Sequence, residues 1–281
     1  MFVWHNRVVL SASLLLDSQG VELADVRCRH RGEGTSDETD RHAVVFVRRG
    51  CFVRSVDGDE QLLEPTRAYC INPGQEQRYD HPHDHGDDCT AVWLDEALLA
   101  SLWGGEAQLP TGGLRVGPRA DVEHRLLLSS LRRGEDRHEA VERALALCAS
   151  VLAGRDAGRV AAGRPVTRAA RRALVDGTRA ALAADPDVPL PQLSATLGAS
   201  PHHLSRVFGA ATGHSIARHR MRLRTRAALE RLAGGDHDLA RLAAETGFAD
   251  QSHLTRVLRA ETGATPAALR RALRSGQRGL A

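Results

Sequence analysis

The sequence predicts an α+β chain of two domains, in which a β-rich domain precedes an all-α domain. Residues 1–100 contain short runs of β-branched and aromatic residues separated by turn signals. Residues 167–281 carry apolar side chains three and four positions apart, which is typical of helices. A ten-residue phrase in that part occurs twice, as LSRVFGAATG at 204–213 and LTRVLRAETG at 254–263. The repeat indicates a duplicated helical unit.

The β-rich region contains four clear strand-like runs. Turn residues such as Arg49-Gly50 and Asp57-Gly58 lie between them. Short strands at even spacing predict a barrel or a sandwich. The predicted strands cover 42–47, 51–56, 67–71 and 89–94.

A helical segment follows the strands. Over residues 121–153, apolar residues such as Leu127, Leu131, Val141 and Leu145 recur at spacings of three and four. This pattern predicts a helical hairpin. The hairpin either covers the sheet or forms a dimer face, because bacterial DNA-binding proteins often work in pairs.

A linker separates the two parts. The stretch AGRDAGRVAAGRPVTRAARR at 153–172 has no clear apolar period in its first half. A chain of 281 residues has room for about two domains. We therefore expect a β-rich domain at 1–153, a linker at 154–166 and an all-α domain at 167–281.

The charges divide in the same place. Every basic residue is an arginine, and residues 164–281 contain 19 of them against 9 acidic residues, a net charge of +10. Residues 1–163 contain 19 arginines against 26 acidic residues, a net charge of −7. A basic segment beside an acidic one indicates that the basic part binds a polyanion such as nucleic acid.

The sequence carries no signal for secretion or for a membrane. No apolar run reaches the roughly 18 residues that a transmembrane helix needs. The first residues lack the basic start and the small-residue cleavage site of a signal peptide. The five cysteines are scattered without a CxxC pair, which suits a reducing compartment. We therefore expect a cytoplasmic protein.

Each copy of the repeat encodes two helices around a tight turn. In the first copy, Gly198 ends a short helix and Ser200-Pro201 begins the next one, as an N-cap residue and a proline in the first turn do. In the second copy, Gly247 and Asp250 take the same places. Helix, glycine turn and capped second helix make up the helix-turn-helix plan.

Polar residues remain on the outer face of each second helix. Side chains of these types hydrogen-bond to base edges, and arginine binds guanine through two hydrogen bonds. Because the second helices of the two copies have similar sequences, we expect each of them to enter the major groove, in two successive turns of the DNA. The alternative is a pair of solvent-facing surfaces on a helical bundle. The predicted base-reading residues are His202, His203, Ser205 and Arg206 in the first copy and Gln251, Ser252, Thr255 and Arg256 in the second.

A single helix is expected to join the two copies. The segment SIARHRMRLRTRAALERLAGG at 215–235 carries an arginine at every second position from 218 to 226. A charged run is usually solvated surface, but this one lies between two groove-reading motifs. We therefore expect Arg218 and Arg222 to contact phosphate.

The C-terminal part resembles the AraC/XylS family of bacterial transcription regulators. The matching stretch is LAAETGFADQSHLTRVLRAETGATPAALR at 242–270, although Leu254 and Leu258 stand where the family more often has phenylalanine. The resemblance covers about residues 168–273. It implies seven helices, with the second helix of each motif in the major groove. It also implies promoter DNA and RNA polymerase as partners and a homodimer as the working form.

The N-terminal part is similar to the cupin domain that binds effectors in many such regulators. The stretch RAYCINPGQEQRYDHP at 67–82 has the cupin order of strand, Pro-Gly turn and return strand. The resemblance implies a cupin-like barrel. Enzymatic cupins usually place a histidine where Gln77 stands, and the usual His-x-His strand is also missing. We therefore expect no catalytic residues, and a cupin enzyme with a DNA-binding appendage is disfavoured.

One cluster in the N-terminal part has the composition of a metal site. The stretch YDHPHDHGDDCT at 79–90 alternates three histidines before a cysteine, and imidazole and thiolate suit zinc, nickel or copper. Turns of this composition are also often solvated loops. The sequence therefore leaves open a metal- or redox-sensing site and an ordinary loop beside an organic-effector pocket. The candidate ligands are His81, His83, His85, Cys89, Cys28 and His30, and the candidate pocket residues are Trp93, Phe46, Phe52, Tyr69 and Tyr79.

These observations predict a DNA-binding transcriptional regulator whose N-terminal domain senses a small-molecule or metal effector. The rival is a constitutive DNA-binding protein whose N-terminal domain only dimerises. The two differ in whether an effector changes the affinity for DNA.

Overall fold

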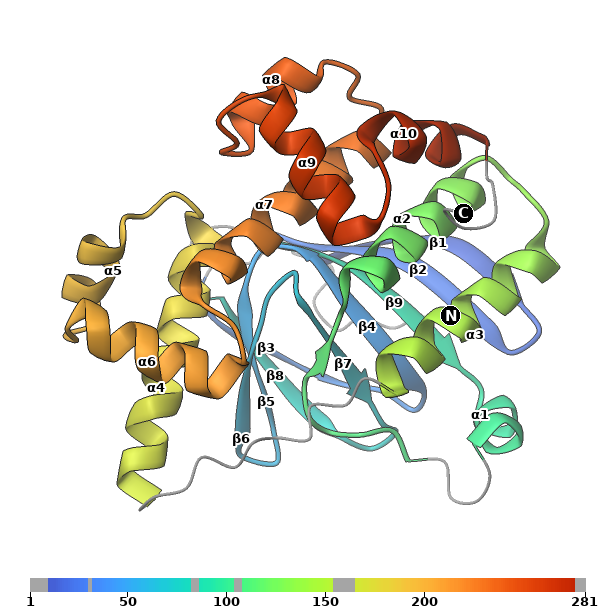
Figure 1. Ribbon diagram of the computed structural model, residues 1–281. Coiled ribbons are helices and arrows are strands. Elements are labelled where there is room, and N and C mark those ends of the chain that lie inside the picture. Colours follow the sequence, from blue (N-terminus) through green and yellow to red (C-terminus); the bar gives the residue numbers. More distant parts are fainter. Residues whose placement is uncertain (1–9, 30–31, 82–85, 104–107, 154–164, 276–281) are drawn as a thin grey trace.

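The computed structural model describes residues 10–29, 32–81, 86–103, 108–153 and 165–275. It confirms the predicted α+β division, with strands in the N-terminal part and helices in the C-terminal part (Figure 1). Every helix in these ranges is too short or too polar to span a lipid bilayer.

Within these ranges, six antiparallel strands form the larger sheet. They are β1 (Leu10–Ser18), β2 (Val21–Cys28), β4 (His42–Arg49), β7 (Arg67–Ile71), β9 (Asp87–Leu94) and β10 (Leu114–Arg115). Their order in the sheet is β1-β2-β9-β4-β7-β10. All residues of β9 and nearly all of β4 are buried, because this sheet is covered on both faces, and their near-continuous apolar runs suit that position.

The smaller sheet contains four strands among the described residues. They are β3 (Gly32–Glu38), β5 (Phe52–Val56), β6 (Asp59–Leu63) and β8 (Glu76–His81), in the order β3-β8-β5-β6. Apolar side chains of the two sheets, such as Val45, Phe52 and Trp93, share one core. In the described part of the chain, no ladder joins the sheets to each other. The predicted barrel is therefore a pair of facing sheets without closure.

Helices cover the outer face of the larger sheet. They are α1 (Glu96–Trp103), α2 (Pro118–Arg132) and α3 (Arg137–Ala153). Leu127 of α2 and Cys148 of α3 share a core with Val44 and Val92 of the sheet. The helical hairpin is confirmed, and one of its faces covers the sheet. Its role as a dimer face stays a prediction.

Seven helices make up the described C-terminal part, as the resemblance implies. They are α4 (Pro165–Ala184), α5 (Leu190–Thr196), α6 (Pro201–Thr212), α7 (Ile216–Ala233), α8 (Leu239–Glu245), α9 (Gln251–Thr262) and α10 (Pro266–Ser275). Helices α4 to α6 gather on one side and α8 to α10 on another, and α7 runs between them (Figure 1). Each group has its own apolar core, and α7 contributes to both.

Helix α2 belongs to the cores of both parts of the chain. While Leu127 faces the sheet, Val122 and Leu126 pack in the core of α7 to α10. The Ser129 hydroxyl donates a hydrogen bond to the carbonyl oxygen of Leu273 in α10, at 2.6 Å. The second helix-turn-helix group is therefore built partly on a helix from the N-terminal part.

A buried ion-pair network joins α7 to the sheet and to α2. The Glu230 carboxylate lies 2.9 Å from Nη1 of Arg48 in β4 and 2.8 Å from Nε of Arg125 in α2. Although burial raises the pKa of Glu230, Arg125 and Arg48 outweigh it and lower this pKa below its usual value. Asp25 of β2 in turn pairs with Arg48 and with Arg132. The charges of Asp25, Arg48 and Arg125 are buried, and each of them has a partner in this network.

A second buried ion pair joins the end of β6 to α4. The Glu64 carboxylate accepts a hydrogen bond from Nη2 of Arg179 at 2.9 Å, and neither side chain is exposed by more than 7%. Burial alone would raise the pKa of Glu64, but Arg179 and a hydrogen bond from Thr66 hold it well below its usual range. The group of α4 to α6 is therefore fixed to the β-rich part by a charge that needs its partner.

Arg179→Met is expected to lower the free energy of unfolding by about 3–5 kcal/mol near neutral pH, because it leaves the Glu64 carboxylate buried and unpaired. In the wild type, the contribution of Glu64 to stability is present above its ordinary pKa of 4.5 and declines as the pH falls below that value. In the variant, protonation of Glu64 instead removes an unpaired charge. The difference in the free energy of unfolding between the wild type and Arg179→Met should therefore become smaller as the pH falls below about 4.5.

Urea unfolding at several pH values measures this difference. Arg172→Met is the matched control, because the Arg172 side chain is 53% exposed and its pair with Asp59 lies in solvent. Equal stability losses for the two variants would contradict the prediction.

Candidate functional site

The first helix-turn-helix motif consists of α5 and α6. Gly198 adopts a left-handed φ of 62° in the turn, and the Ser200 side chain caps α6 by accepting a hydrogen bond from the backbone N–H of His203. Leu204 and Phe208 are fully buried under the helix. These local features confirm the predicted motif and fix which face of α6 is outside.

All four predicted base-reading residues of α6 lie on its exposed face. Arg206 Nη2 lies 3.2 Å from Nδ1 of His203, one turn earlier. The four residues are His202, His203, Ser205 and Arg206.

The second motif, α8 and α9, repeats this construction. Asp250 caps α9 by accepting a hydrogen bond from the backbone N–H of His253 at 2.7 Å. Gly247 has a φ of 76°, and a Cβ atom there would lie 2.6 Å from Nε of Arg224 on α7. The left-handed conformation favours glycine in this turn, whereas the guanidinium of Arg224 is the end of a flexible side chain. Leu254 and Leu258 are fully buried.

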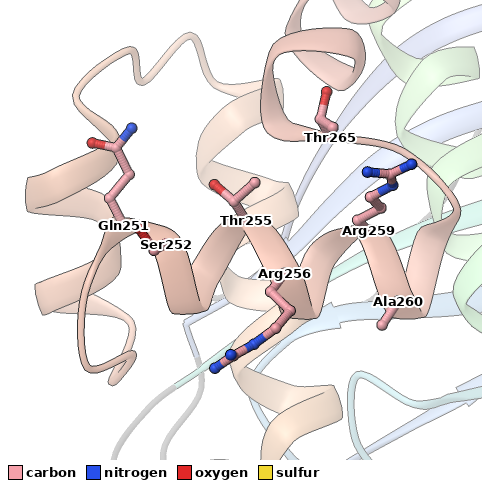
Figure 2. Close-up of a pocket in the computed structure, with 7 residues that line it drawn as sticks. All are labelled: Gln251, Ser252, Thr255, Arg256, Arg259, Ala260 and Thr265. Atoms are coloured by element: carbon pink, nitrogen blue, oxygen red, sulfur yellow. The ribbon is translucent and has the colours of Figure 1, made fainter.

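The outer surface of α9 forms a shallow polar pocket. Gln251, Ser252 and Arg256 are exposed, and Thr255 is half-buried. Figure 2 shows that Arg259 and Thr265 extend the same surface. Neither residue is among the predicted base-reading residues, although Arg259 follows Arg256 by three positions and so lies one turn further along the helix. The lining residues are Gln251, Ser252, Thr255, Arg256, Arg259, Ala260 and Thr265.

The five arginines between positions 218 and 226 of α7 divide into two groups. Arg220 donates a hydrogen bond to the carbonyl oxygen of Val188 at 2.6 Å, Arg224 pairs with Asp187, and the buried Arg226 bonds to the carbonyl oxygen of Val116. These three arginines hold the helix in the structure.

The two arginines that we expected to contact phosphate are less enclosed than Arg226. The Arg218 side chain is 54% exposed and pairs with Glu261 of α9 at 2.7 Å, and Arg222 is half-buried. Their contact with phosphate stays a prediction.

A comparison with protein families identifies the C-terminal part. The family model described as a helix-turn-helix domain matches residues 193–272. These residues form a helix-turn-helix domain of the AraC type. The AraC-type domain points to a DNA-binding regulator rather than an enzyme. No curated protein matches the chain.

Several solved structures are similar to this chain at low identity. ToxT from Vibrio cholerae O395 is 9% identical with a TM-score of 0.36, and the match covers 91% of this chain and 99% of that chain. The C-terminal domain of AraT, a response regulator from Geobacillus stearothermophilus, is 23% identical with a TM-score of 0.30, over 41% of this chain and 88% of that chain. A Cupin_2 domain of an XRE family transcriptional regulator from Enterobacter cloacae is 11% identical with a TM-score of 0.28. The match covers 31% of this chain and 96% of that chain.

The predicted metal ligands are only partly brought together. Cys28 and His81 meet, and the carboxylate that joins them is Asp87, which the sequence did not predict as a ligand. Cys89 is adjacent, since its Sγ donates a hydrogen bond to Oδ1 of Asp87 at 3.0 Å. Burial opposes protonation of His81, but its interactions with Asp87 and Cys28 raise its pKa to about 9. The remaining candidates, His30, His83 and His85, lie outside the described residues.

The predicted pocket aromatics are mostly core. The ring of Phe52 packs against Tyr69 and Tyr79 between the two sheets, with centroids 6.0 and 5.9 Å apart, and Trp93 belongs to the same cluster. Phe46 points to the opposite face of the larger sheet and lies 4.9 Å from the ring of His124. The five residues therefore do not share one pocket.

Proposed function

We propose that the protein is a sequence-specific transcriptional regulator that binds promoter DNA in the cytoplasm as a homodimer and acts on RNA polymerase. Under this proposal, residues 1–153 sense an effector, 154–166 link the two parts, and 167–281 bind DNA. The observation that carries the proposal is the AraC-type domain with two exposed, similarly built second helices, α6 and α9.

The length of α7 supports two contacts with one face of a duplex. This helix has 18 residues and is therefore about 27 Å long. Successive major grooves on one face of DNA are about 34 Å apart. A helix of this length that carries one motif near each end suits that spacing.

The charge of the C-terminal part supports a role for phosphate contacts. Arg218 and Arg222 lie on α7 between the two motifs, where they would contact the backbone of DNA that both motifs engage. Base reading would fall to the exposed side chains of α6 and α9, with Arg206 and Arg256 as guanine readers.

The affinity of the full chain for DNA should depend steeply on salt. Each phosphate contacted contributes a slope of about −0.9 to the log–log plot, so about four contacts would lower affinity about a hundredfold between about 50 and 200 mM salt. A selection from random duplexes supplies the preferred sequence, and fluorescence anisotropy at several salt concentrations gives the slope. An affinity that does not change with salt would contradict the proposed interface.

Arg206→Ala and Arg256→Ala should each remove discrimination at a different base pair, at a cost of about 1–3 kcal/mol. The two affected positions should lie about one helical turn apart, because the motifs would enter successive grooves. Repeating the selection with each variant measures both effects.

Two further variants test the assignment of roles. Arg218→Ala should weaken binding to all duplexes alike, as loss of a phosphate contact does. Arg172→Ala, on α4 outside both motifs, should change neither affinity nor sequence preference. A uniform loss of affinity in Arg206→Ala and Arg256→Ala would show that these helices do not read bases.

A buried arginine between the sheets supports the proposed sensing of a ligand. The Arg54 side chain is 1% exposed and lies 4.8 Å over the ring of Tyr69. Its Nε donates to Gln77 and its Nη2 to the carbonyl oxygen of Cys70. Among the described residues, no carboxylate pairs with Arg54, and its Nη1 has no hydrogen-bond partner. A buried cation of this kind suits an effector that carries an anionic group.

Arg54→Met is expected to leave the stability of the effector-free chain within about 1 kcal/mol of the wild type, because it replaces an unpaired buried charge by apolar volume. Arg179→Met, which breaks a compensated pair, should be far more destabilising. Urea unfolding compares the two. If Arg54→Met were as destabilising as Arg179→Met, Arg54 would be a structural residue rather than one kept for a ligand.

A further inference from the structure

A thiol, an imidazole and a carboxylate meet where the two sheets come together. Cys28 ends β2 and Asp87 begins β9 in the larger sheet, while His81 ends β8 in the smaller one. All three residues are buried, and one potential ligand atom from each lies within 4.8 Å of the other two.

The backbone around these three residues is closely packed. The β2–β9 ladder places Cys28 directly opposite Asp87. A Cβ atom on Gly86 would lie 1.9 Å from the carbonyl oxygen of Cys28, and one on Gly50 would lie 2.5 Å from the carbonyl oxygen of Gly86. Only glycine permits these approaches. The closely packed backbone therefore fixes the Cα positions of Cys28 and Asp87 relative to each other.

The carboxylate of Asp87 is held at both oxygens. Its Oδ2 lies 2.6 Å from Nε2 of His81, and its Oδ1 accepts a hydrogen bond from Sγ of Cys89. Cys89 thus orients Asp87 from the side away from His81. A fixed ligand with a supporting hydrogen bond is the usual arrangement around protein-bound metals.

We propose that Cys28, His81 and Asp87 form a binding site for a divalent transition-metal ion of the zinc class. Sulfur, nitrogen and oxygen donors together favour zinc and its neighbours over magnesium and calcium, which prefer oxygen ligands alone. Zinc bonds of about 2.0–2.3 Å place two ligand atoms of one ion about 3.5 Å apart. The ligand atoms lie within 4.8 Å of one another, and the 2.6 Å contact between His81 and Asp87 would lengthen when both bind one ion.

The charges of the ligands match a divalent cation. The thiolate of Cys28 and the carboxylate of Asp87 supply two negative charges, and neutral His81 completes the set, so the occupied site carries no net charge in its buried position. Metal ligands must be deprotonated, so binding releases protons to solvent and should weaken in acid. The ion would tie β2 and β9 to β8 and so join the two sheets.

This site is distinct from the place where the cupin resemblance would locate a metal. Gln77 occupies that place, and its Oε1 accepts a hydrogen bond from Nε of the buried Arg54 at 2.8 Å. A guanidinium repels a cation. The two sheets therefore have a cationic group in the middle and a cation-binding ligand set at one corner.

The test uses the full chain without a histidine tag, freed of metal by a chelator and titrated with Co²⁺ and with Zn²⁺. The wild type should bind one ion per chain, and bound Co²⁺ should show thiolate-to-metal charge-transfer absorption. Cys28→Ser should lose this absorption and weaken Zn²⁺ binding at least a hundredfold in competition with a chromophoric chelator. Cys148→Ser is the matched control, because Cys148 is an equally buried thiol in α3 and should leave binding unchanged.

Asp87→Asn preserves the shape of the side chain and should weaken Zn²⁺ binding at least tenfold. This variant tests the site even if Cys28→Ser does not fold. Absence of stoichiometric binding in the wild type would overturn the proposal. So would loss of binding in a His83→Ala, His85→Ala double variant while Cys28→Ser still binds, because the ion would then lie elsewhere. The readout does not involve DNA, so its outcome is independent of the proposed regulatory function.

Discussion

The carboxylate of Glu230 fixes the helix on which both helix-turn-helix motifs depend. It lies on α7, it is enclosed by Arg48 of the sheet and Arg125 of α2, and the two contacts are 2.9 and 2.8 Å long. The Glu230 side chain is half-buried, whereas Arg48 and Arg125 are buried and need this carboxylate as a partner. Because α7 contributes to the cores of both motifs, its position relative to the sheets also sets theirs.

The two motifs are attached to the β-rich part by different kinds of interaction. The group of α4 to α6 contacts it through the buried pair of Glu64 and Arg179. The group of α8 to α10 shares an apolar core with Val122 and Leu126 of α2, and Leu273 accepts a hydrogen bond from Ser129. Apolar contact is non-directional and tolerates small shifts, whereas a buried ion pair depends on geometry. A change in the sheets would therefore act differently on the two groups.

The helix-turn-helix plan was predictable because its signals are local. Gly198, Ser200, Gly247 and Asp250 lie where the sequence predicts them, and caps and glycine turns depend on a few neighbouring residues. The exposed faces of α6 and α9 were also predictable, because the apolar residues within each helix mark its buried face and leave the polar residues outside.

Features that depend on distant segments were not predictable in the same way. Arg226 belongs to a run that reads as solvated surface, yet it is buried beside Asp121 of α2. Asp87 joins Cys28 and His81 through a strand register that has no local signal. The separation of the strands into two sheets likewise depends on pairing between segments far apart in the chain.

Helix α2 couples the sheets to the second helix-turn-helix group, because its side chains belong to the cores of both. Without α2, the apolar surface of α8 to α10 that Val122 and Leu126 cover would be exposed to water. Unfolding of the sheets would carry α2 with it, and so would weaken the second motif at the same time. A ligand that binds the folded sheets would therefore also favour the folded state of the second helix-turn-helix group, without a change of shape.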